Sequence, residues 1–421
     1  HERMPDGSPN LTKAYIAWAL GSLGFYYAWF HRVLPSVMVD RLMAEFAVSG
    51  AILGTLSALY FYAYAALQLP VGAMVDRWGP GVPYASALIL AALGSALFAT
   101  TKSIELAYLG RIVIGIGCAF GWVAALKIIA LYFPPARFAM LSGAGMCIGL
   151  SGGFSGQMIA GTMVDAFGWR VTMWGMAASG TVLSLAVFTL VSRRGPTTGD
   201  SAPPPTMKEI FTSFGIALRQ LQVWLVAGGG AIASAPRFVF GSRWGIPYLM
   251  QFHDLSRPHA ASLTAMMLIG WGLGALFSGW LSDKVGQRRQ PLLIGLFIAF
   301  AALMIAIYVP ELSPTVIGAL MLVNGLASGV IVLTYAIAGD LAPDNARGST
   351  FAFANMLIIL SGAVFQPLSG WLLDLNWTGI VEDGARVYDL ATYETMFLIV
   401  PATYVVGIAM IMMSRNTEKT T

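Results

Sequence analysis

The sequence predicts an all-α integral membrane protein, with twelve transmembrane helices in two six-helix bundles that repeat one another. Its 421 residues are 57% hydrophobic and only 10% charged, whereas soluble globular proteins carry about 25% charged residues. The mean hydropathy is +0.72. These values exclude a soluble enzyme and a disordered chain. A nucleic-acid-binding protein is also excluded, because a net charge of +4 is too small for a surface that tracks phosphates.

Each predicted span is an apolar run of about 20 residues, the length that crosses a bilayer. The runs of the first half cover residues 14–38, 50–74, 81–101, 105–131, 139–163 and 171–192. Those of the second half cover residues 219–249, 259–281, 291–309, 314–339, 350–374 and 391–413. The hydrophilic, proline-rich segment 193–218 has the composition of a linker. We therefore expect a bundle at 1–192, a cytoplasmic linker at 193–218 and a second bundle at 219–421.

The distribution of basic residues predicts the orientation. With the N-terminus in the cytoplasm, the cytoplasmic segments hold 14 Lys and Arg residues and the outer loops hold five. Cytoplasmic loops are enriched in Lys and Arg in membrane proteins. We expect both termini and the linker to be cytoplasmic, in a multi-pass protein of the inner (plasma) membrane.

Three short motifs recur at nearly the same offset. Residues 72–79 recur at 279–286 with an offset of 207, residues 135–137 at 345–347 with an offset of 210, and residues 161–165 at 370–374 with an offset of 209. Such a duplication predicts two structurally related halves with a binding site between them.

These motifs carry a family resemblance. The pattern G-x-x-x-D-[RK]-x-G at 72–79 and 279–286 resembles the signature of the major facilitator superfamily, and 111–119 is similar to its R-x-x-x-G-x-G-x-A motif. The resemblance covers the whole chain and implies a non-enzymatic transporter that works by rocker-switch alternating access. The fifth span is rich in glycine but lacks the proline of drug/proton antiporters, which argues against drug efflux.

The resemblance also implies a gate on the cytoplasmic side. In this family the aspartates of the repeated motifs cap helix ends and pair with arginines that hold that side shut. The residues concerned here are Asp76, Arg77, Asp283, Lys284, Arg137 and Arg347. The alternative is that the aspartates are ordinary turn residues.

Two further stretches resemble particular branches of the superfamily. Tyr26-Tyr27 with His31-Arg32 in the first span, and Arg237 with Trp244 and Tyr248 in the seventh, are similar to organophosphate/phosphate antiporters and to anion symporters. In those families an arginine from each of these spans binds the anionic substrate.

Five basic residues lie inside the predicted spans, and no Asp or Glu lies near the middle of any span. A charge inside a membrane costs at least about 2.5–3.5 kcal/mol, so a water-filled cavity that accepts an anion is the simplest explanation. Arg32 and Arg237 are repeat mates at an offset of 205 and could bind a carboxylate or phosphate in bidentate fashion. Alternatively, they extend to the interface or cap a neighbouring helix.

The other ionisable residues of the spans have competing interpretations. His31 is either a packed structural residue or a proton sensor. Lys127 either extends to the cytoplasmic surface or contacts the cavity. Arg111 belongs to the family motif, for which the resemblance implies a structural or a coupling role, and we favour the structural one. Arg243 either stacks on an aromatic ring or reaches the outer surface or the cavity.

Polar and aromatic residues mark the helix faces that could line a cavity. Ser57, Tyr60, Tyr64 and Gln68 follow one another at spacings of three, four and four residues, which places them on one helical face. Trp29 shares a face with Arg32, Trp244 and Tyr248 share one with Arg237, and Asn355 and Gln366 share one in the eleventh span. Hydrogen bonding between helices is the alternative role.

The sequence therefore predicts a secondary transporter, acting as symporter or exchanger, for a small organic anion such as a carboxylate, a sugar acid or an organophosphate. The expected partners are the anionic substrate, the lipid bilayer, and protons or a counter-anion. We expect a monomer with no nucleic-acid partner, no cofactor and no metal, since the four histidines lack ligand spacing. The alternatives are a transporter of amino acids, peptides or a siderophore, and a non-transporting receptor.

Overall fold

The computed structural model describes residues 11–133, 135–191, 208, 212, 215–216, 218–285, 288–341 and 347–415. The first half of the chain contains α1 (Leu11–Val33), η1 (Leu34–Val37), α2 (Val39–Phe46), α3 (Gly50–Trp78), α4 (Gly81–Thr100), α5 (Ile104–Cys118), α6 (Gly121–Tyr132), α7 (Pro135–Phe167) and α8 (Trp169–Leu190). The second half contains α10 (Leu221–Val223), η2 (Trp224–Gly228), α11 (Gly229–Ala233), η3 (Arg237–Trp244), α12 (Gly245–Phe252), α13 (Arg257–Val285), α14 (Arg289–Tyr308), α15 (Pro314–Ser328), η4 (Gly329–Val332), α16 (Leu333–Leu341), α17 (Arg347–Leu375), β1 (Val381–Glu382), β2 (Ala385–Arg386), α18 (Leu390–Phe397) and α19 (Ile399–Met413).

The predicted all-α membrane fold is confirmed. Within the described residues, ten helical stretches are long and apolar enough to cross a membrane. Helices α1 and α7 have 23 and 33 residues but are not among the ten, so for these two the span stays a prediction. The segment 193–218 lies largely outside the described residues.

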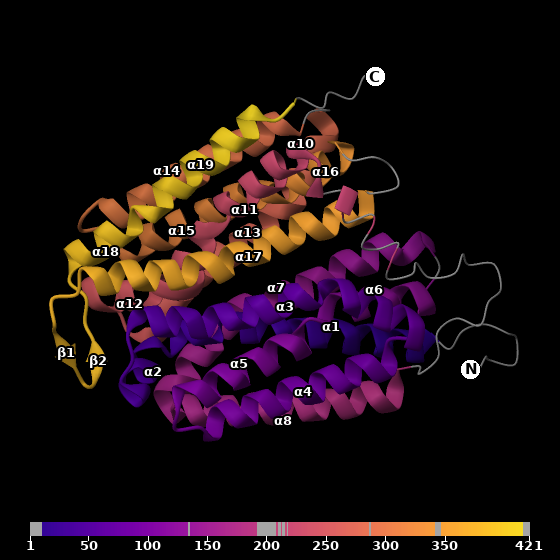
Figure 1. Ribbon diagram of the computed structural model, residues 1–421, viewed down its shortest axis with the longest axis horizontal. Coiled ribbons are helices and arrows are strands. Elements are labelled where there is room, and N and C mark those ends of the chain that lie inside the picture. Colours follow the sequence, from indigo (N-terminus) through magenta and orange to yellow (C-terminus); the bar gives the residue numbers. More distant parts are fainter. Residues whose placement is uncertain are drawn as a thin grey trace, which may run out of the picture.

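The helices form two groups of roughly parallel rods, with α1–α8 in one and α10–α19 in the other (Figure 1). The start of α1 and the end of α19 lie at the same end of the molecule. At the opposite end lie α2, α12 and the antiparallel β1–β2 hairpin, and we call it the hairpin end.

The two groups meet along the helix pairs α3–α17 and α7–α13. Glycines allow the close approach of α3 to α17, because a Cβ atom added at Gly54 would lie 2.6 Å from the carbonyl oxygen of Gln366. Small residues let membrane helices approach closely in this way. The interface is therefore tightest toward the hairpin end, where α3 begins and α17 ends.

The repeat is visible in the helix bounds. Helices α3 and α13 each have 29 residues, and both their first and their last residues are 207 positions apart. Both helices include the repeated G-x-x-x-D-[RK]-x-G motif up to its penultimate position, so the motif lies at a helix end. The side chains of Asp76, Arg77, Asp283, Lys284, Arg137 and Arg347 lie outside the described part of the structure, and their gating role stays a prediction.

The seventh span is irregular where it carries its charges. After α11 the chain passes Pro236, which has no N–H to donate, and enters the π-helical segment η3, Arg237–Trp244. Departures of this kind from α-helical geometry occur frequently at functional sites. Arg237 and Arg243 are the first and the penultimate residues of this segment.

Candidate functional site

Arg32, in the last turn of α1, stacks on an aromatic ring of its own helix. Its guanidinium carbon lies 4.2 Å from the ring centroid of Trp29 and 5.1 Å from that of Tyr64 in α3. The Nε atom of Arg32 is buried and has no hydrogen-bond partner. The i, i+3 spacing of Trp29 and Arg32 brings them together on one helical face, as the sequence predicted.

Arg237 makes the corresponding arrangement in the second half. Its guanidinium carbon lies 4.4 Å from the ring centroid of Trp271 in α13, its side chain is buried, and its Nη1 atom has no partner. The rings of Trp29 and Trp271 are 6.1 Å apart. The two cation–π pairs therefore meet across the interface between the halves.

The unpaired polar atoms of these four residues are all hydrogen-bond donors. They are Arg32 Nε, Arg237 Nη1 and the two indole Nε1 atoms of Trp29 and Trp271. Among the described residues, neither arginine forms an ion pair. A buried cluster of donors with two positive charges complements an anion chemically, since charge-assisted hydrogen bonds to guanidinium groups are among the strongest in proteins.

An apolar wall flanks this group. Trp29 packs against Phe25, Val33 and Leu268, with Trp122, Met146, Leu150 and Phe154 around them. In the second half, the Tyr335 hydroxyl donates to Asn355 Oδ1 at 3.1 Å, so Asn355 links α17 to α16.

The stripe on α3 is divided between the site and helix packing. Tyr64 forms part of the wall beside Arg32. The Tyr60 hydroxyl donates to the Ala28 carbonyl at 2.9 Å, and Gln68 Nε2 lies 3.4 Å from the carbonyl oxygens of Tyr64 and Ala119. Tyr60 and Gln68 therefore link helices within the first half.

Other predicted residues lie apart from the arginine pair. Trp244 donates its Nε1 proton to Ser369 Oγ at 2.9 Å, and the Tyr248 hydroxyl donates to the Ile307 carbonyl at 3.1 Å; both lie toward the hairpin end. Gln366 is buried in α17 with its Oε1 atom unpartnered, and Lys127 is half-buried in α6.

His31 is turned away from Arg32, into the first half. It is completely buried, its Nε2 atom lies 3.2 Å from Ser95 Oγ in α4, and its ring packs edge-on at 4.6 Å against Tyr27. This environment is that of a packed histidine.

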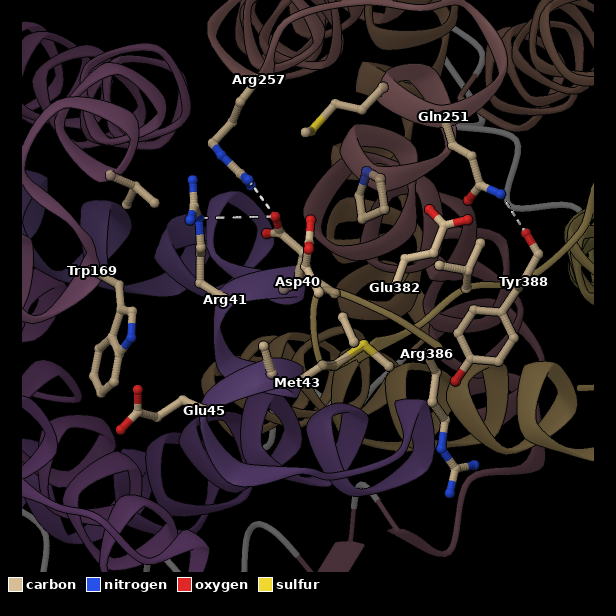
Figure 2. A pocket seen from close by; sticks show the side chains of 18 of the residues that line it. Asp40, Arg41, Met43, Glu45, Trp169, Gln251, Arg257, Glu382, Arg386 and Tyr388 are labelled. Atoms are coloured by element: carbon tan, nitrogen blue, oxygen red, sulfur yellow. Dashed lines mark hydrogen bonds and ion pairs between the residues drawn. The ribbon is translucent and has the colours of Figure 1, made fainter. Parts of the chain in front are cut away.

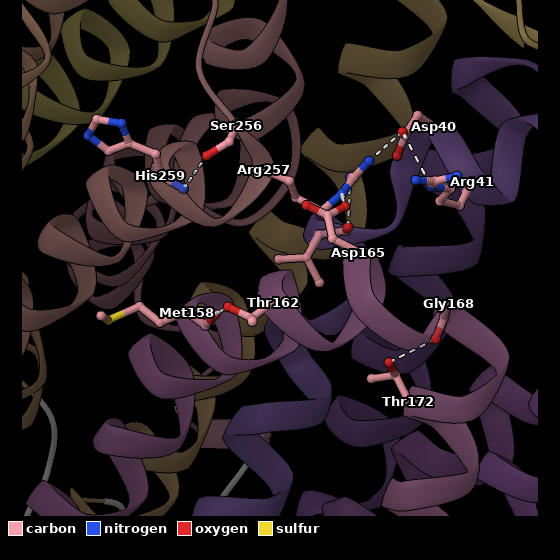
Figure 3. A network of polar contacts seen from close by, with 11 residues as sticks. Asp40, Arg41, Met158, Thr162, Asp165, Gly168, Thr172, Ser256, Arg257 and His259 are labelled. Carbon is pink, nitrogen blue, oxygen red and sulfur yellow. Dashed lines mark hydrogen bonds and ion pairs between the residues drawn. The ribbon is translucent and has the colours of Figure 1, made fainter.

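Arg257, the first residue of α13, connects the two halves at the hairpin end. It donates to Asp165 Oδ1 at 2.7 Å, to Asp40 Oδ2 at 2.5 Å and to the Val37 carbonyl at 2.9 Å, and Figure 3 shows it between the two carboxylates. The arginine side chain is only 4% exposed. Sequence reasoning assigned Arg257 to an outer loop and missed this network.

Asp374, near the end of α17, caps the first turn of α3 in the other half. It accepts hydrogen bonds from the backbone N–H groups of Gly50 and Ala51 at 3.2 and 2.8 Å. Tyr388 donates to it at 2.7 Å and Arg386 at 3.2 Å. Burial, together with the hydrogen bond to Asp374, raises the pKa of Tyr388 above its usual range, so the phenol stays a proton donor.

A cavity of about 940 Å³ opens at the hairpin end. Figure 2 shows side chains from both halves around it, among them Asp40, Arg41, Arg257, Gln251 and Tyr388. Its lining does not include the central arginines. The water-filled chamber predicted around Arg32 and Arg237 stays a prediction.

The family follows from comparison with known proteins. Residues 19–243 and 226–421 match the family model described as Major Facilitator Superfamily. The chain belongs to this superfamily. The resemblance found in the sequence motifs is thereby confirmed.

Relatives within the superfamily are distant but cover most of the chain. An uncharacterized transporter of Bacillus subtilis, YybO, is 22% identical over 409 residues, which are 87% of this chain and 89% of that protein. The probable sulfoacetate transporter SauU of Cupriavidus necator is also 22% identical, over 84% of this chain and 85% of its own. Because such superfamily relatives are transporters, this chain is a membrane transporter and not an enzyme.

A solved superfamily structure has the same fold. The bacterial homologue of the human lysosomal transporter Spinster, in an inward-facing and unoccupied conformation, has a TM-score of 0.76 at 19% identity and covers 96% of this chain and 95% of its own. At this identity the likeness describes the fold alone.

Trp271 is the site residue that sequence reasoning missed. It lies in a small-residue stretch of α13, with no polar neighbour to draw attention to it. The signal that could have found it is the rarity of tryptophan in the middle of a span, since membrane tryptophans concentrate at the two interfaces.

Proposed function

We propose that this transporter carries a small organic anion, such as a carboxylate, a sugar acid or an organophosphate, and that Arg32 and Arg237 bind its charged group. The observation that carries the proposal is the pair of Arg–Trp stacks, Trp29–Arg32 and Trp271–Arg237, whose unpaired buried atoms are all donors. The name of the relative SauU, a probable sulfoacetate transporter, describes cargo of the same chemical class.

In this proposal the two halves, with boundaries near residues 1–192 and 219–421, rock about the central site. The termini are cytoplasmic in the plasma membrane, because basic residues concentrate on that side. The Arg257 and Asp374 contacts at the hairpin end then close the outer side, and they break when the cargo is exposed there. A bound cargo changes the balance between the two states only by as much as its affinity differs between them.

The proposed coupling is exchange of anions or symport with a proton. Because His31 is packed within the first half, away from the arginines, we favour exchange, which needs no titrating group beside the cargo. Uptake into proteoliposomes that requires internal anion and ignores an imposed pH gradient supports exchange. Uptake driven by the gradient without internal anion contradicts it.

The cargo class is tested by ligand-induced thermal stabilisation, because a ligand that binds the folded state raises its apparent stability. The probes are sulfoacetate, glucuronate and glycerol 3-phosphate, compared with the neutral glucose and glycerol. We expect at least one anion to raise the melting temperature of the purified protein while the neutral compounds do not. Amino acids and peptides complete the panel, and stabilisation by these alone contradicts the proposal.

Two conservative variants and a control connect the result to the site. Arg32→Lys and Arg237→Lys retain the charge but lose the bidentate geometry. The ligand concentration that gives half-maximal stabilisation should therefore rise at least tenfold in each variant. Arg170→Lys is the control, because Arg170 pairs with Glu45 at 2.5 Å on the hairpin-end surface. Anion stabilisation that is unchanged in both site variants contradicts the assignment.

A further inference from the structure

Two more arginines are buried, one in each half, and the proposed cargo site does not use them. Arg111 of α5 is 2% exposed and Arg243 of η3 is 0% exposed. Within the described residues neither forms an ion pair. Each is therefore a buried positive charge without a negatively charged partner among the described residues.

The hydrogen bonding of the two guanidinium groups is alike. Arg111 donates through Nη1 to the His31 carbonyl at 2.9 Å, and Arg243 donates through Nη1 to Ser57 Oγ at 3.0 Å. In both residues the Nε and Nη2 atoms are buried and have no partner. The N–H groups of these two atoms point in parallel and can bind one anion together. We call this pair of donors the fork of the arginine, and neither fork has a hydrogen-bond partner.

The two side chains approach the same stretch of α3. The guanidinium carbon of Arg111 lies 4.7 Å from the ring centroid of Tyr60, and Arg243 bonds to Ser57. Ser57 and Tyr60 are three residues apart and hence neighbours on one helical face. Arg111 belongs to the first half and Arg243 to the second, so the pair spans the interface.

We propose that Arg111 and Arg243 together bind one small inorganic monovalent anion of about the size of chloride. Two unpaired guanidinium groups in an apolar interior are strongly unfavourable, and an anion held by both forks removes most of that cost. The site lies nearer the hairpin end than the cargo site, because Ser57 and Tyr60 precede Tyr64 on α3.

The two pairs of arginines differ in exposure. A cargo must enter and leave in every cycle, and in the proposed cargo site Arg32 is half-buried while Arg237 is 8% exposed. Arg243 is completely buried, beside Trp244, whose ring centroid is 5.2 Å from its guanidinium carbon. Since the anion contacts both halves, it stabilises the arrangement in which the hairpin end is closed. This inference does not depend on which cargo is carried.

The test measures thermal unfolding of the purified full-length protein while sodium chloride replaces sodium gluconate at constant ionic strength and pH. The melting temperature of the wild type should rise with chloride and saturate, and bromide should act similarly. Arg111→Gln and Arg243→Gln should lose this dependence. Arg237→Gln and the surface control Arg170→Gln should retain it, which separates the inference from the proposed cargo site.

A flat response of the wild type to chloride would overturn the inference, and so would chloride dependence that persists in Arg243→Gln. If Arg243→Gln does not fold, Arg243→Lys keeps the charge without the fork, and its half-saturating chloride concentration should rise at least tenfold. Anomalous diffraction from crystals grown with bromide gives a direct check. A bromide peak between Arg111 and Arg243 supports the site, and loss of that peak with saturating glucuronate or glycerol 3-phosphate identifies the cargo as the occupant and overturns it.

Discussion

Arginines at the hairpin end and arginines at the centre of the interface are buried or half-buried, yet their partners differ. Arg257 has two carboxylates, Asp40 and Asp165. Arg32 and Arg237 have tryptophan rings and unpaired donor atoms instead. Burial alone therefore does not distinguish a structural arginine from a ligand-binding one, whereas the supply of acceptors does.

A second comparison concerns two aspartates that the repeat makes equivalent. Asp165 and Asp374 are 209 residues apart, and each contacts the first residues of a helix in the other half. Asp165 does so through the Arg257 side chain, and Asp374 through the backbone N–H groups of Gly50 and Ala51. The two contacts thus occupy equivalent positions but differ in chemistry, since Asp165 contacts the other half by an ion pair and Asp374 by a helix cap.

The largest expected effect is on cargo binding at the centre. Arg237→Met should reduce the affinity for the cargo anion at least about 30-fold, because losing one member of a buried charged contact costs about 2–5 kcal/mol. Without ligand, the melting temperature should stay the same or rise, since an unpaired buried charge is replaced by an apolar side chain. A marked loss of ligand-free stability would contradict the distinction between the two groups of arginines.

Arg257→Gln, unlike Arg237→Met, should reduce the stability of the protein without ligand. Asp165 would lose its ion-pair partner and Asp40 would keep only Arg41, at 4.0 Å, so the state closed at the hairpin end should be destabilised by about 1–3 kcal/mol. Spin labels at the exposed positions Lys102 and Glu311, one in each half, would report a second, longer distance. The labelling background is Cys147→Ser, because Cys147 is exposed and Cys118 is buried. A single unchanged distance would contradict the role of Arg257.

Replacement by asparagine should have a larger effect at Asp374 than at Asp165. Asp374→Asn places an amide donor against the four donors that surround Asp374, and should destabilise the closed state by about 1–2 kcal/mol. Asp165→Asn should cost only about 0.5–1 kcal/mol, because Arg257 retains Asp40. The same distance measurement compares them, and a larger effect for Asp165→Asn would reverse our interpretation.

Tyr388→Phe should give the smallest effect. It removes the hydrogen bond to Asp374 and the one that the Tyr388 hydroxyl accepts from the Gly50 N–H at 3.1 Å. The two helix-capping bonds to Asp374 remain, so about 0.5–1 kcal/mol is expected. Tyr308→Phe is the matched control, because its hydroxyl donates to the Glu394 carbonyl within the second half. Equal shifts in the distance distribution for the two variants would show that Tyr388 has no particular part in the contact.

The sequence predicted the membrane fold and placed Trp29, Arg32 and Tyr64 on helix faces that converge in the structure. These predictions worked because hydropathy and helical periodicity are local properties. Partners of side chains are not local. Tyr60, Trp244 and Tyr248 form hydrogen bonds within one half of the molecule, and spacing along a helix cannot separate such bonds from contacts with a cargo.

For the same reason, the sequence could not predict the hydrogen bonds and ion pairs between segments that are far apart along the chain. Arg257 meets Asp40 across 217 residues, and Asp374 meets Gly50 across 324. In the sequence Arg257, Asp40 and Asp374 were only charges in loops or at helix ends. The repeat pointed to Asp165 and Asp374 as a pair, but only three-dimensional packing identifies what each one contacts.

The most direct test of the anion site compares binding of glucuronate and of its neutral methyl ester to the wild type and to the double variant Arg32→Gln/Arg237→Gln, after the panel has identified glucuronate or an analogous acid as a ligand. We predict that the wild type binds the ionised acid at least 100-fold more tightly than the ester, and that the double variant loses this preference. Equal binding of acid and ester by the wild type, or an undiminished preference in the double variant, would contradict the account.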